Sequence, residues 1–200
     1  MWKIWPFLIS REAKPASTRR HIAATLAQTV AMWSFFLLIA PLTLSTLEHR
    51  LGIPSINFDF FGKRVLAAIL FACFGSLGIW CGVIMAAQGL GTPLPSYCPQ
   101  RLIILGPYRY IRNPMALSSF IQGFCVAAWL NSSFAALYVV AGALLWNFLA
   151  RPWEEADLES RFGEPFLAYR REVRCWYPRL RPYVPSQAVY SSVNEGQSTT

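Results

Sequence analysis

Charge and metal-ligating side chains are scarce in this sequence of 200 residues. Only 14% of the residues are charged, whereas a soluble domain carries about 25%. The two histidines are isolated, and none of the five cysteines belongs to a C-x-x-C pair. The sequence therefore gives no sign of a zinc site or a disulfide framework, and we predict no bound metal. It also lacks a P-loop and a G-x-G-x-x-G after a strand, so a nucleotide-like cofactor would need another kind of site.

Long uncharged stretches are present instead, at residues 22–47, 65–88 and 114–150. An apolar run of about 18 residues or more is a candidate membrane-spanning helix. The third stretch is too long for one span, and its Asn131-Ser132-Ser133 cluster predicts a turn between helices at 115–130 and 134–151.

The predicted fold is an all-α integral membrane protein with about four transmembrane helices, the last two a tight hairpin, and a short cytosolic C-terminal helical segment. At ~1.5 Å per residue each hairpin helix would be about 24 Å long, short of a ~30 Å hydrocarbon core, so a re-entrant hairpin is the alternative. We expect a basic lead at 1–21, a membrane domain at 22–183 with its site at 89–116 and 150–182, and a disordered polar tail at 184–200. Helical signals continue the last span from Glu154 to Phe162, Gly163 should break that helix, and Glu164–Arg174 should form a short amphipathic helix.

The charge distribution predicts the orientation. Lysine and arginine together number 18 against 10 acids, and they concentrate before the first span, between the second and third, and after the fourth. By the positive-inside rule both termini and the loop at 89–113 lie in the cytoplasm. Because the cations flank predicted spans rather than forming one folded face, nucleic-acid binding is disfavoured.

The stretch from Gly106 to Asn113 is polar, aromatic and cationic, and it runs directly into the third apolar stretch. Asn113 and Pro114 form a helix-start signal, and a helix beginning there points free amides into the preceding loop. Together with Arg109 and Arg112 this arrangement favours an anion site. Simple anchoring of the arginines to lipid phosphates is an equal alternative, and for Tyr108 a structural interfacial role competes with stacking on an adenine ring.

Two adjacent acids, Glu154 and Glu155, stand where the hairpin leaves the membrane. A solvated helix extension is the simplest interpretation, but an acid facing anionic headgroups would be stabilised by a cationic ligand or a nearby arginine. The two ends of the hairpin thus combine anion and cation recognition. S-adenosylmethionine carries both a carboxylate and positive centres and fits that combination. Glu155 could accept the proton of an amine acceptor.

Several motifs occur in an order that resembles the isoprenylcysteine carboxyl methyltransferase family, in its broad bacterial branch, which is akin to phospholipid N-methyltransferases. They are Gly91-Thr92-Pro93-x-Pro95, Arg101-Leu102-Ile103, the segment from Gly106 to Met115, Glu154-Glu155, Arg161-Phe162-Gly163-Glu164, Tyr169 and Tyr177-Pro178-Arg179-Leu180. The resemblance covers roughly residues 62–182 and implies an integral membrane enzyme that uses S-adenosylmethionine.

The resemblance also implies site residues. The cofactor would contact Gln100, Arg101, Leu102, Ile103, Tyr108, Asn113, Pro114, Met115, Ala116 and Glu154. We add Gly106 and Arg112 to the predicted cofactor-binding residues, because they belong to the same loop. Arg151 is the nearest candidate for the family's substrate-contacting arginine. The sequence departs from the family at Ala116, where a tyrosine is usual, which bears on cofactor affinity and substrate choice.

The prediction is therefore a methyltransferase that takes S-adenosylmethionine from the cytosol and an amphiphilic or lipid-linked acceptor, carboxylate or amine, from the bilayer. Two other classes remain open at this point. An NADPH-dependent membrane reductase of related architecture would need more positive charge near the adenosine phosphate. A non-catalytic membrane scaffold would be consistent with the change at Ala116.

Overall fold

The computed structural model describes residues 17–54, 60–89 and 101–185, and within these ranges every regular element is helical. The chain forms two compact units. One, here called the helical unit, comprises Ala27–Ile79 and Met115–Pro152; the other, the polar unit, comprises Met1–Leu26, Trp80–Pro114 and Trp153–Thr200. Each is described by itself below.

Within the described residues, three helices are long and apolar enough to cross a membrane, namely Thr18–Arg50, Lys63–Gln88 and Ser133–Phe162, and the apolar helix Pro114–Leu130 is shorter. The prediction of an all-α membrane fold is confirmed: about four spans are expected from the sequence, and three to four helices of the described residues are suited to span. The second predicted span coincides with α3 (Lys63–Gln88).

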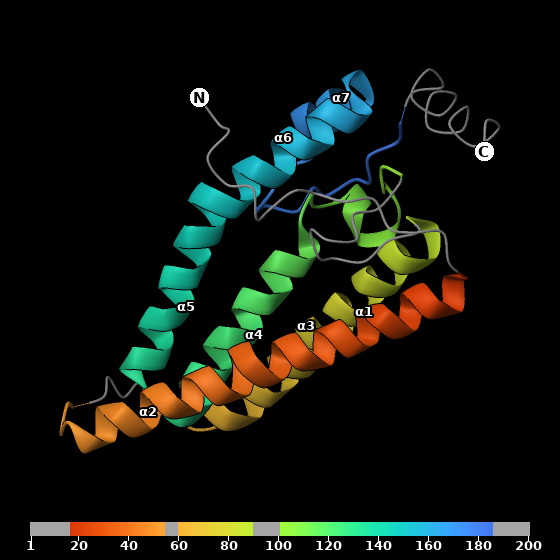
Figure 1. The fold of residues 1–200 in the computed structure, drawn as a ribbon. Coiled ribbons are helices and arrows are strands. Elements are labelled where there is room, and N and C mark those ends of the chain that lie inside the picture. Colours follow the sequence, from red (N-terminus) through yellow and green to blue (C-terminus); the bar gives the residue numbers. More distant parts are fainter. Residues whose placement is uncertain (1–16, 55–59, 90–100, 186–200) are drawn as a thin grey trace. The chain divides into compact units, whose positions relative to one another are not determined.

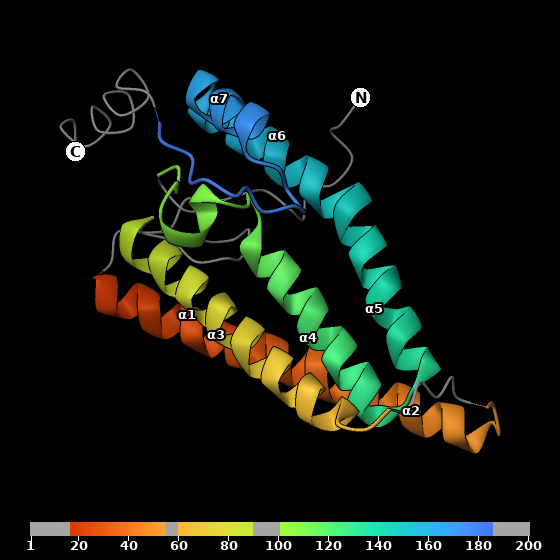
Figure 2. The ribbon, with the colours of Figure 1, turned by 180° about the vertical axis from the view of Figure 1, so that it is seen from behind.

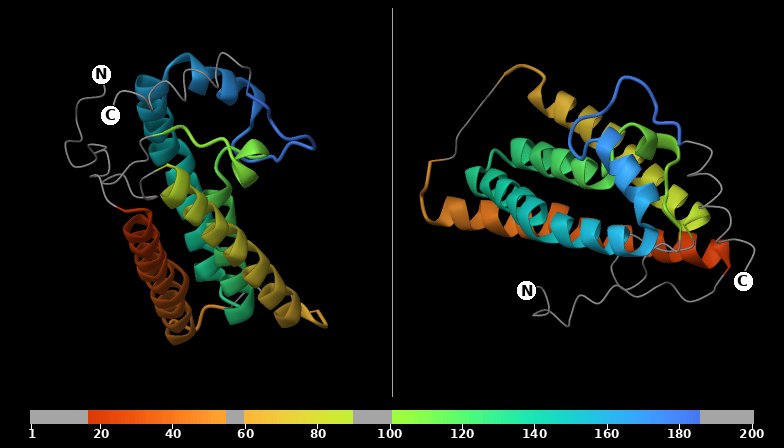
Figure 3. Two further views of the ribbon diagram at one scale, coloured as in Figure 1. Left: turned by 90° about the vertical axis from the view of Figure 1, so that its right-hand side faces the viewer. Right: turned by 90° about the horizontal axis from the view of Figure 1, so that it is seen from above.

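The first long helix is continuous but changes its winding at its centre. It consists of α1 (Thr18–Trp33), the π-helical segment η2 (Ser34–Ile39) and α2 (Ala40–Arg50), which Figure 3 shows as one helical path. Pro41 lies in the first turn of α2 and has no N–H to donate to the preceding turn. The wider π-helical turns directly before it are the local adjustment to that missing donor.

The predicted hairpin is present in the helical unit. Helix α4 (Pro114–Leu130) and helix α5 (Ser133–Leu145) run in opposite directions from a tight turn (Figures 1 and 2). Asn131 adopts a left-handed conformation with φ of 52°, which asparagine tolerates better than most residues. The Ser132 side chain accepts a hydrogen bond from the Ala135 N–H at 3.1 Å and so caps α5.

The hairpin turn is fixed by the ends of two other helices. Glu48, near the end of α2, is fully buried and accepts hydrogen bonds from the Ser132 hydroxyl and from the N–H groups of Ser133 at 3.0 Å and Phe134 at 3.2 Å. Lys63, the first residue of α3, donates to the Asn131 side-chain oxygen. The turn therefore lies at the end of the helical unit where α2 ends and α3 begins.

Small residues bring α3 close to its neighbour α4. A Cβ placed on Gly78 would lie 3.0 Å from the Ser118 hydroxyl, and that hydroxyl donates to the carbonyl of Phe74. Glycine and serine at such positions allow the backbones of membrane helices to approach and to form hydrogen bonds between helices.

The last long helix continues beyond the hairpin. After α5 come the π-helical segment η5 (Trp146–Ala150) and α6 (Arg151–Phe162). This path of 30 residues joins the predicted hairpin helix at 134–151 to its predicted continuation at 154–162. Gly163, with φ of +55°, ends it, and α7 (Glu164–Glu172) follows, as the sequence predicts.

Candidate active site

The loop between α3 and α4 begins with an extended segment in which buried and half-buried side chains alternate. Leu102 and Ile104 are buried in a cluster with Phe166, Tyr169, Val173 and Tyr183 from α7 and the residues after it. Arg101 and Ile103 are half-buried. Among the predicted cofactor residues, Leu102 is thus part of the core of the polar unit, whereas Arg101 and Ile103 keep accessible surface.

The short 3₁₀ helix η4 (Gly106–Arg109) follows and depends on its first residue. Gly106 has φ of +53°, and a Cβ there would lie 2.7 Å from the Cδ1 atom of Ile84 near the end of α3. Only glycine combines this conformation with such close packing. The packing against Ile84 therefore explains why position 106 is a glycine, independently of the cofactor contact that the sequence predicts for it.

Tyr108 lies in the core of the polar unit. Its side chain is 5% exposed, its hydroxyl donates to the Cys81 carbonyl at 3.4 Å, and its own carbonyl accepts from the Tyr169 hydroxyl at 2.6 Å. Burial raises the pKa of both Tyr108 and Tyr169 above the usual range of tyrosine. Both phenols are therefore neutral hydrogen-bond donors over the physiological range, and they hold η4 against α3 and α7.

The segment after α7 follows the residues around η4 through main-chain hydrogen bonds. The Arg112 N–H donates to the Arg174 carbonyl at 2.9 Å, the Arg179 N–H to the Tyr110 carbonyl at 2.8 Å, and the Tyr183 N–H to the Arg109 carbonyl at 2.8 Å. The Arg109 side chain returns a hydrogen bond to the Tyr183 carbonyl at 2.9 Å. Arg109, one of the two arginines in the predicted anion loop, therefore binds a main-chain carbonyl of the same chain.

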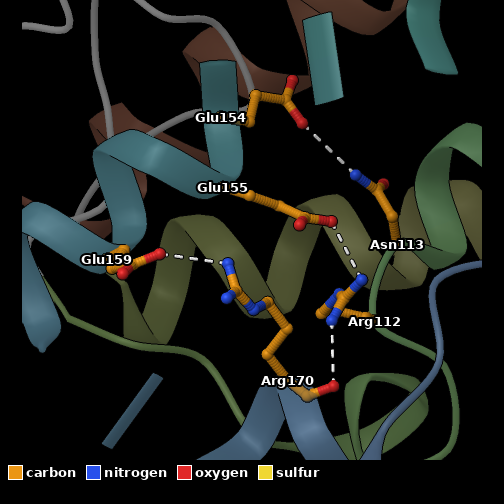
Figure 4. A network of polar contacts seen from close by, with 6 residues as sticks. All are labelled: Arg112, Asn113, Glu154, Glu155, Glu159 and Arg170. Atoms are coloured by element: carbon orange, nitrogen blue, oxygen red, sulfur yellow. Dashed lines mark hydrogen bonds and ion pairs between the residues drawn. The ribbon is translucent and has the colours of Figure 1, made fainter. Parts of the chain in front are cut away.

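Two consecutive residues before α4 meet two consecutive acids on α6 (Figure 4). The Arg112 guanidinium lies 2.9 Å from the Glu155 carboxylate, and the Asn113 amide nitrogen lies 3.4 Å from a Glu154 oxygen. The side chains of Arg112 and Glu155 are only 13% and 19% exposed. The two ends of the predicted hairpin are therefore joined by direct polar contacts within the polar unit.

Arg112 makes a third contact that ties in α7. Its second terminal nitrogen donates to the carbonyl of Arg170 at 3.1 Å, and the side chain of Arg170 pairs with Glu159 at 3.0 Å (Figure 4). Arg170 and Tyr169 thus support the site. The sequence includes Tyr169 among the motif residues without giving it this role, and it gives no indication of Arg170. The sequence identified α7 as an amphipathic helix, but no spacing along the chain indicates which acid or carbonyl it meets.

Other predicted site residues lie elsewhere. Pro114 begins α4 in the polar unit and is buried, whereas Met115 and Ala116 follow it in the helical unit. Arg151 is the first residue of α6 and also belongs to the helical unit. Gln100 lies outside the described residues. In the described ranges no group of three or more histidine, cysteine or acidic side chains could hold a metal ion.

A family model described as phospholipid methyltransferase matches residues 63–165. The chain belongs to this family. The match covers α3, the loop with η4, the hairpin and α6, and so it contains both polar pairs that join Arg112 and Asn113 to Glu155 and Glu154. Tyr169 and the segment that follows it lie beyond the matched residues.

Membership of this family confirms the resemblance drawn from the motifs. Together with the apolar helices, it indicates that the chain is an integral membrane protein and a membrane methyltransferase. No curated protein and no solved structure shows significant similarity to the chain.

Proposed function

We propose that the chain is an S-adenosylmethionine-dependent methyltransferase that methylates an amphiphilic or lipid-linked acceptor at the cytoplasmic surface of the membrane. The observation that carries this proposal is the pairing of Arg112 with Glu155 and of Asn113 with Glu154. It gathers a carboxylate, an amide and a helix start beside one another, and these groups are chemically suited to a ligand with both an anionic and a cationic end.

The donor set fits such a cofactor. Glu154 would accept a charge-assisted hydrogen bond from the cofactor's ammonium group. Asn113 and Pro114, where α4 begins, would receive its carboxylate at the positive end of the helix dipole. We further propose contacts from Gln100, Arg101, Ile103, Met115 and Ala116. The cofactor supplies an electrophilic methyl group on a sulfonium.

The protein's own contribution to methyl transfer would be positioning and exclusion of water. A carboxylate acceptor needs no base. An amine acceptor must lose a proton, and Glu155 is the proposed acceptor of that proton, held in place by Arg112. Arg151, one helical turn before Glu154, is the proposed contact for the acceptor.

The orientation is also part of the proposal. Seven arginines lie between residues 151 and 181, and the loop between the first two spans is nearly balanced in charge. The positive-inside rule then places the polar unit and both termini in the cytoplasm. Cofactor would arrive from that side and the acceptor from the bilayer.

Ligand-dependent thermal stability of the purified full chain in detergent tests the proposal. S-adenosylhomocysteine at saturating concentration should raise the melting temperature, because a ligand that binds only the folded state stabilises it, whereas NADPH should not. Stabilisation by NADPH instead would favour the reductase, and stabilisation by neither would favour a scaffold. Transfer of a radiolabelled methyl group from S-adenosylmethionine to extracted lipids then identifies the acceptor.

A further inference from the structure

The segment 174–184, here called the C-terminal loop, exposes several large apolar side chains. The side chain of Leu180 is 100% exposed, that of Tyr177 is 70% exposed and that of Val184 is 66% exposed. These residues stand away from the core cluster that contains Tyr183, so neighbouring positions on the loop alternate between anchoring and exposure.

The loop is held firmly in spite of this exposure. Three main-chain hydrogen bonds of 2.8–2.9 Å attach it to Arg109, Tyr110 and Arg112, and Cys175 and Tyr183 are buried. Because the backbone is anchored on both sides of Leu180, a local rearrangement cannot bury the leucine side chain, and its apolar surface stays in contact with water. Three exposed apolar side chains on one anchored segment make it a candidate surface for an apolar partner.

The charge of the loop indicates which partner. Between residues 173 and 185 there are three arginines and no acid. Arg179 pairs with Glu172 at 3.4 Å, whereas Arg174 and Arg181 are exposed on either side of the leucine. Arginine beside tyrosine, tryptophan and an aliphatic tip is the composition of segments that lie at a membrane–water interface.

We propose that the C-terminal loop docks on an anionic lipid surface, with Leu180 inserted below the headgroups and Arg174 and Arg181 in contact with lipid phosphates. The same chain contains helices that are long and apolar enough to cross a membrane, so a bilayer is the apolar partner that the chain itself supplies. Cationic side chains near such a surface are attracted to its anionic lipids, and the apolar tip gains by leaving water.

Docking of the loop would also affect the candidate site, whether or not that site is catalytic. The Arg174 carbonyl accepts the hydrogen bond from the Arg112 N–H, and Arg112 in turn holds Glu155. A loop fixed on the headgroups therefore fixes the depth of this ion pair relative to them. The inference depends on the membrane character of the chain and not on the identity of the cofactor.

The experiment uses the full chain, with its native cysteines replaced by alanine, reconstituted in vesicles. A polarity-sensitive fluorophore is attached at Leu180→Cys, and in the control at Ser160→Cys, an exposed position on α6. In vesicles with anionic phospholipid the Leu180 label should shift to the blue and be quenched by spin-labelled lipids, and the shift should shrink in purely zwitterionic vesicles. Melting temperature confirms that each labelled variant is folded.

Arg174→Gln and Arg181→Gln provide the second arm, since neither substitution removes a main-chain anchor. Each should lower the docking equilibrium about five-fold, the effect of one cationic side chain near an anionic surface. A Leu180 signal that is indistinguishable from the Ser160 signal, or that ignores both the anionic lipid fraction and the two arginine substitutions, overturns the proposal. S-adenosylhomocysteine binding, measured on the same samples, reports separately on the proposed cofactor.

Discussion

Arg112 and Glu155 are 43 positions apart in the sequence, yet their guanidinium and carboxylate groups lie 2.9 Å apart. The arginine that sequence reasoning assigned to an anionic ligand is therefore engaged by an acid of the same chain. This relationship changes the expected division of roles: Arg112 positions Glu155, and Glu154 with Asn113 remains the proposed contact for the cofactor.

The ion pair should contribute to stability. Arg112→Ala removes the contacts to Glu155 and to the Arg170 carbonyl, and we expect a loss of about 2–4 kcal/mol in the free energy of unfolding. Glu155→Gln retains an acceptor and should cost only about 1–2 kcal/mol. Chemical denaturation in detergent measures both, and similar small losses would mean that the pair is solvent-screened. The double variant reports their coupling.

Glu154 should matter more for cofactor binding than a solvated acid of the same helix. Glu154→Gln removes the charge of a proposed cofactor contact and should weaken S-adenosylhomocysteine binding by roughly ten- to a hundredfold, since a hydrogen bond to a charged group is worth about 1.5–3 kcal/mol. Glu159→Gln is the matched control, because the Glu159 carboxylate pairs at the surface with the Arg170 side chain, whereas Glu154 is the acid that contacts Asn113. Equal effects in calorimetric titration would assign Glu154 to a solvated helix face.

Asn113 separates helix capping from cofactor recognition. Loss of an N-cap alone costs roughly 0.5–2 kcal/mol of stability, so Asn113→Ala should lower the melting temperature modestly. If Asn113 also contacts the cofactor, affinity should fall further than this stability loss explains. Ser119→Ala is the appropriate control, because Ser119 is exposed, whereas the neighbouring Ser118 is buried and bonded to Phe74. A lower melting temperature with unchanged affinity would leave residue 113 as a cap only.

Glu48 should stabilise the hairpin from a distance. Glu48→Ala leaves the Ser132 hydroxyl and the first N–H groups of α5 without this acceptor, and we expect a loss of about 2–4 kcal/mol. Glu48→Gln should cost less, because the amide oxygen still accepts. Thr46→Ala, an exposed change on the same helix, is the control. A Glu48→Ala variant as stable as this control would show that the turn does not depend on the α2 end.

The topology can be tested by labelling from either side of a vesicle. In a background without native cysteines, Ser133→Cys at the hairpin turn and Leu51→Cys after α2 should react from one side, and Ser160→Cys on α6 from the other. The reason is that Glu48 and Lys63 hold the turn at the end of the helical unit where α2 ends and α3 begins. Reaction of Ser133→Cys from the same side as Ser160→Cys would mean that the hairpin is re-entrant.

Much of the fold followed from local features of the chain. The uncharged runs, Asn131-Ser132-Ser133 and Gly163 predicted the spans, the hairpin turn and the break before α7, and the structure confirms them. Each of these signals depends only on residues that are close to it in the sequence. Helix bounds were less predictable: the first helix runs from Thr18 to Arg50 instead of 22–47, because polar residues at helix ends extend a helix without adding to its apolar run.

The sequence by itself also determined which residues carry polar chemistry, since Arg112, Asn113, Glu154 and Glu155 stand at abrupt changes from polar to apolar sequence. Only the tertiary structure decided how they are paired, that Tyr108 and Leu102 belong to a core, and that Tyr169, Arg170 and Arg174 support the loop. The physical reason is that pairing is a matter of distance across the fold. The free energy of an ion pair or of a buried phenol depends on partners that lie 27 to 61 residues away in the sequence. Composition and periodicity do not indicate which residues those partners are.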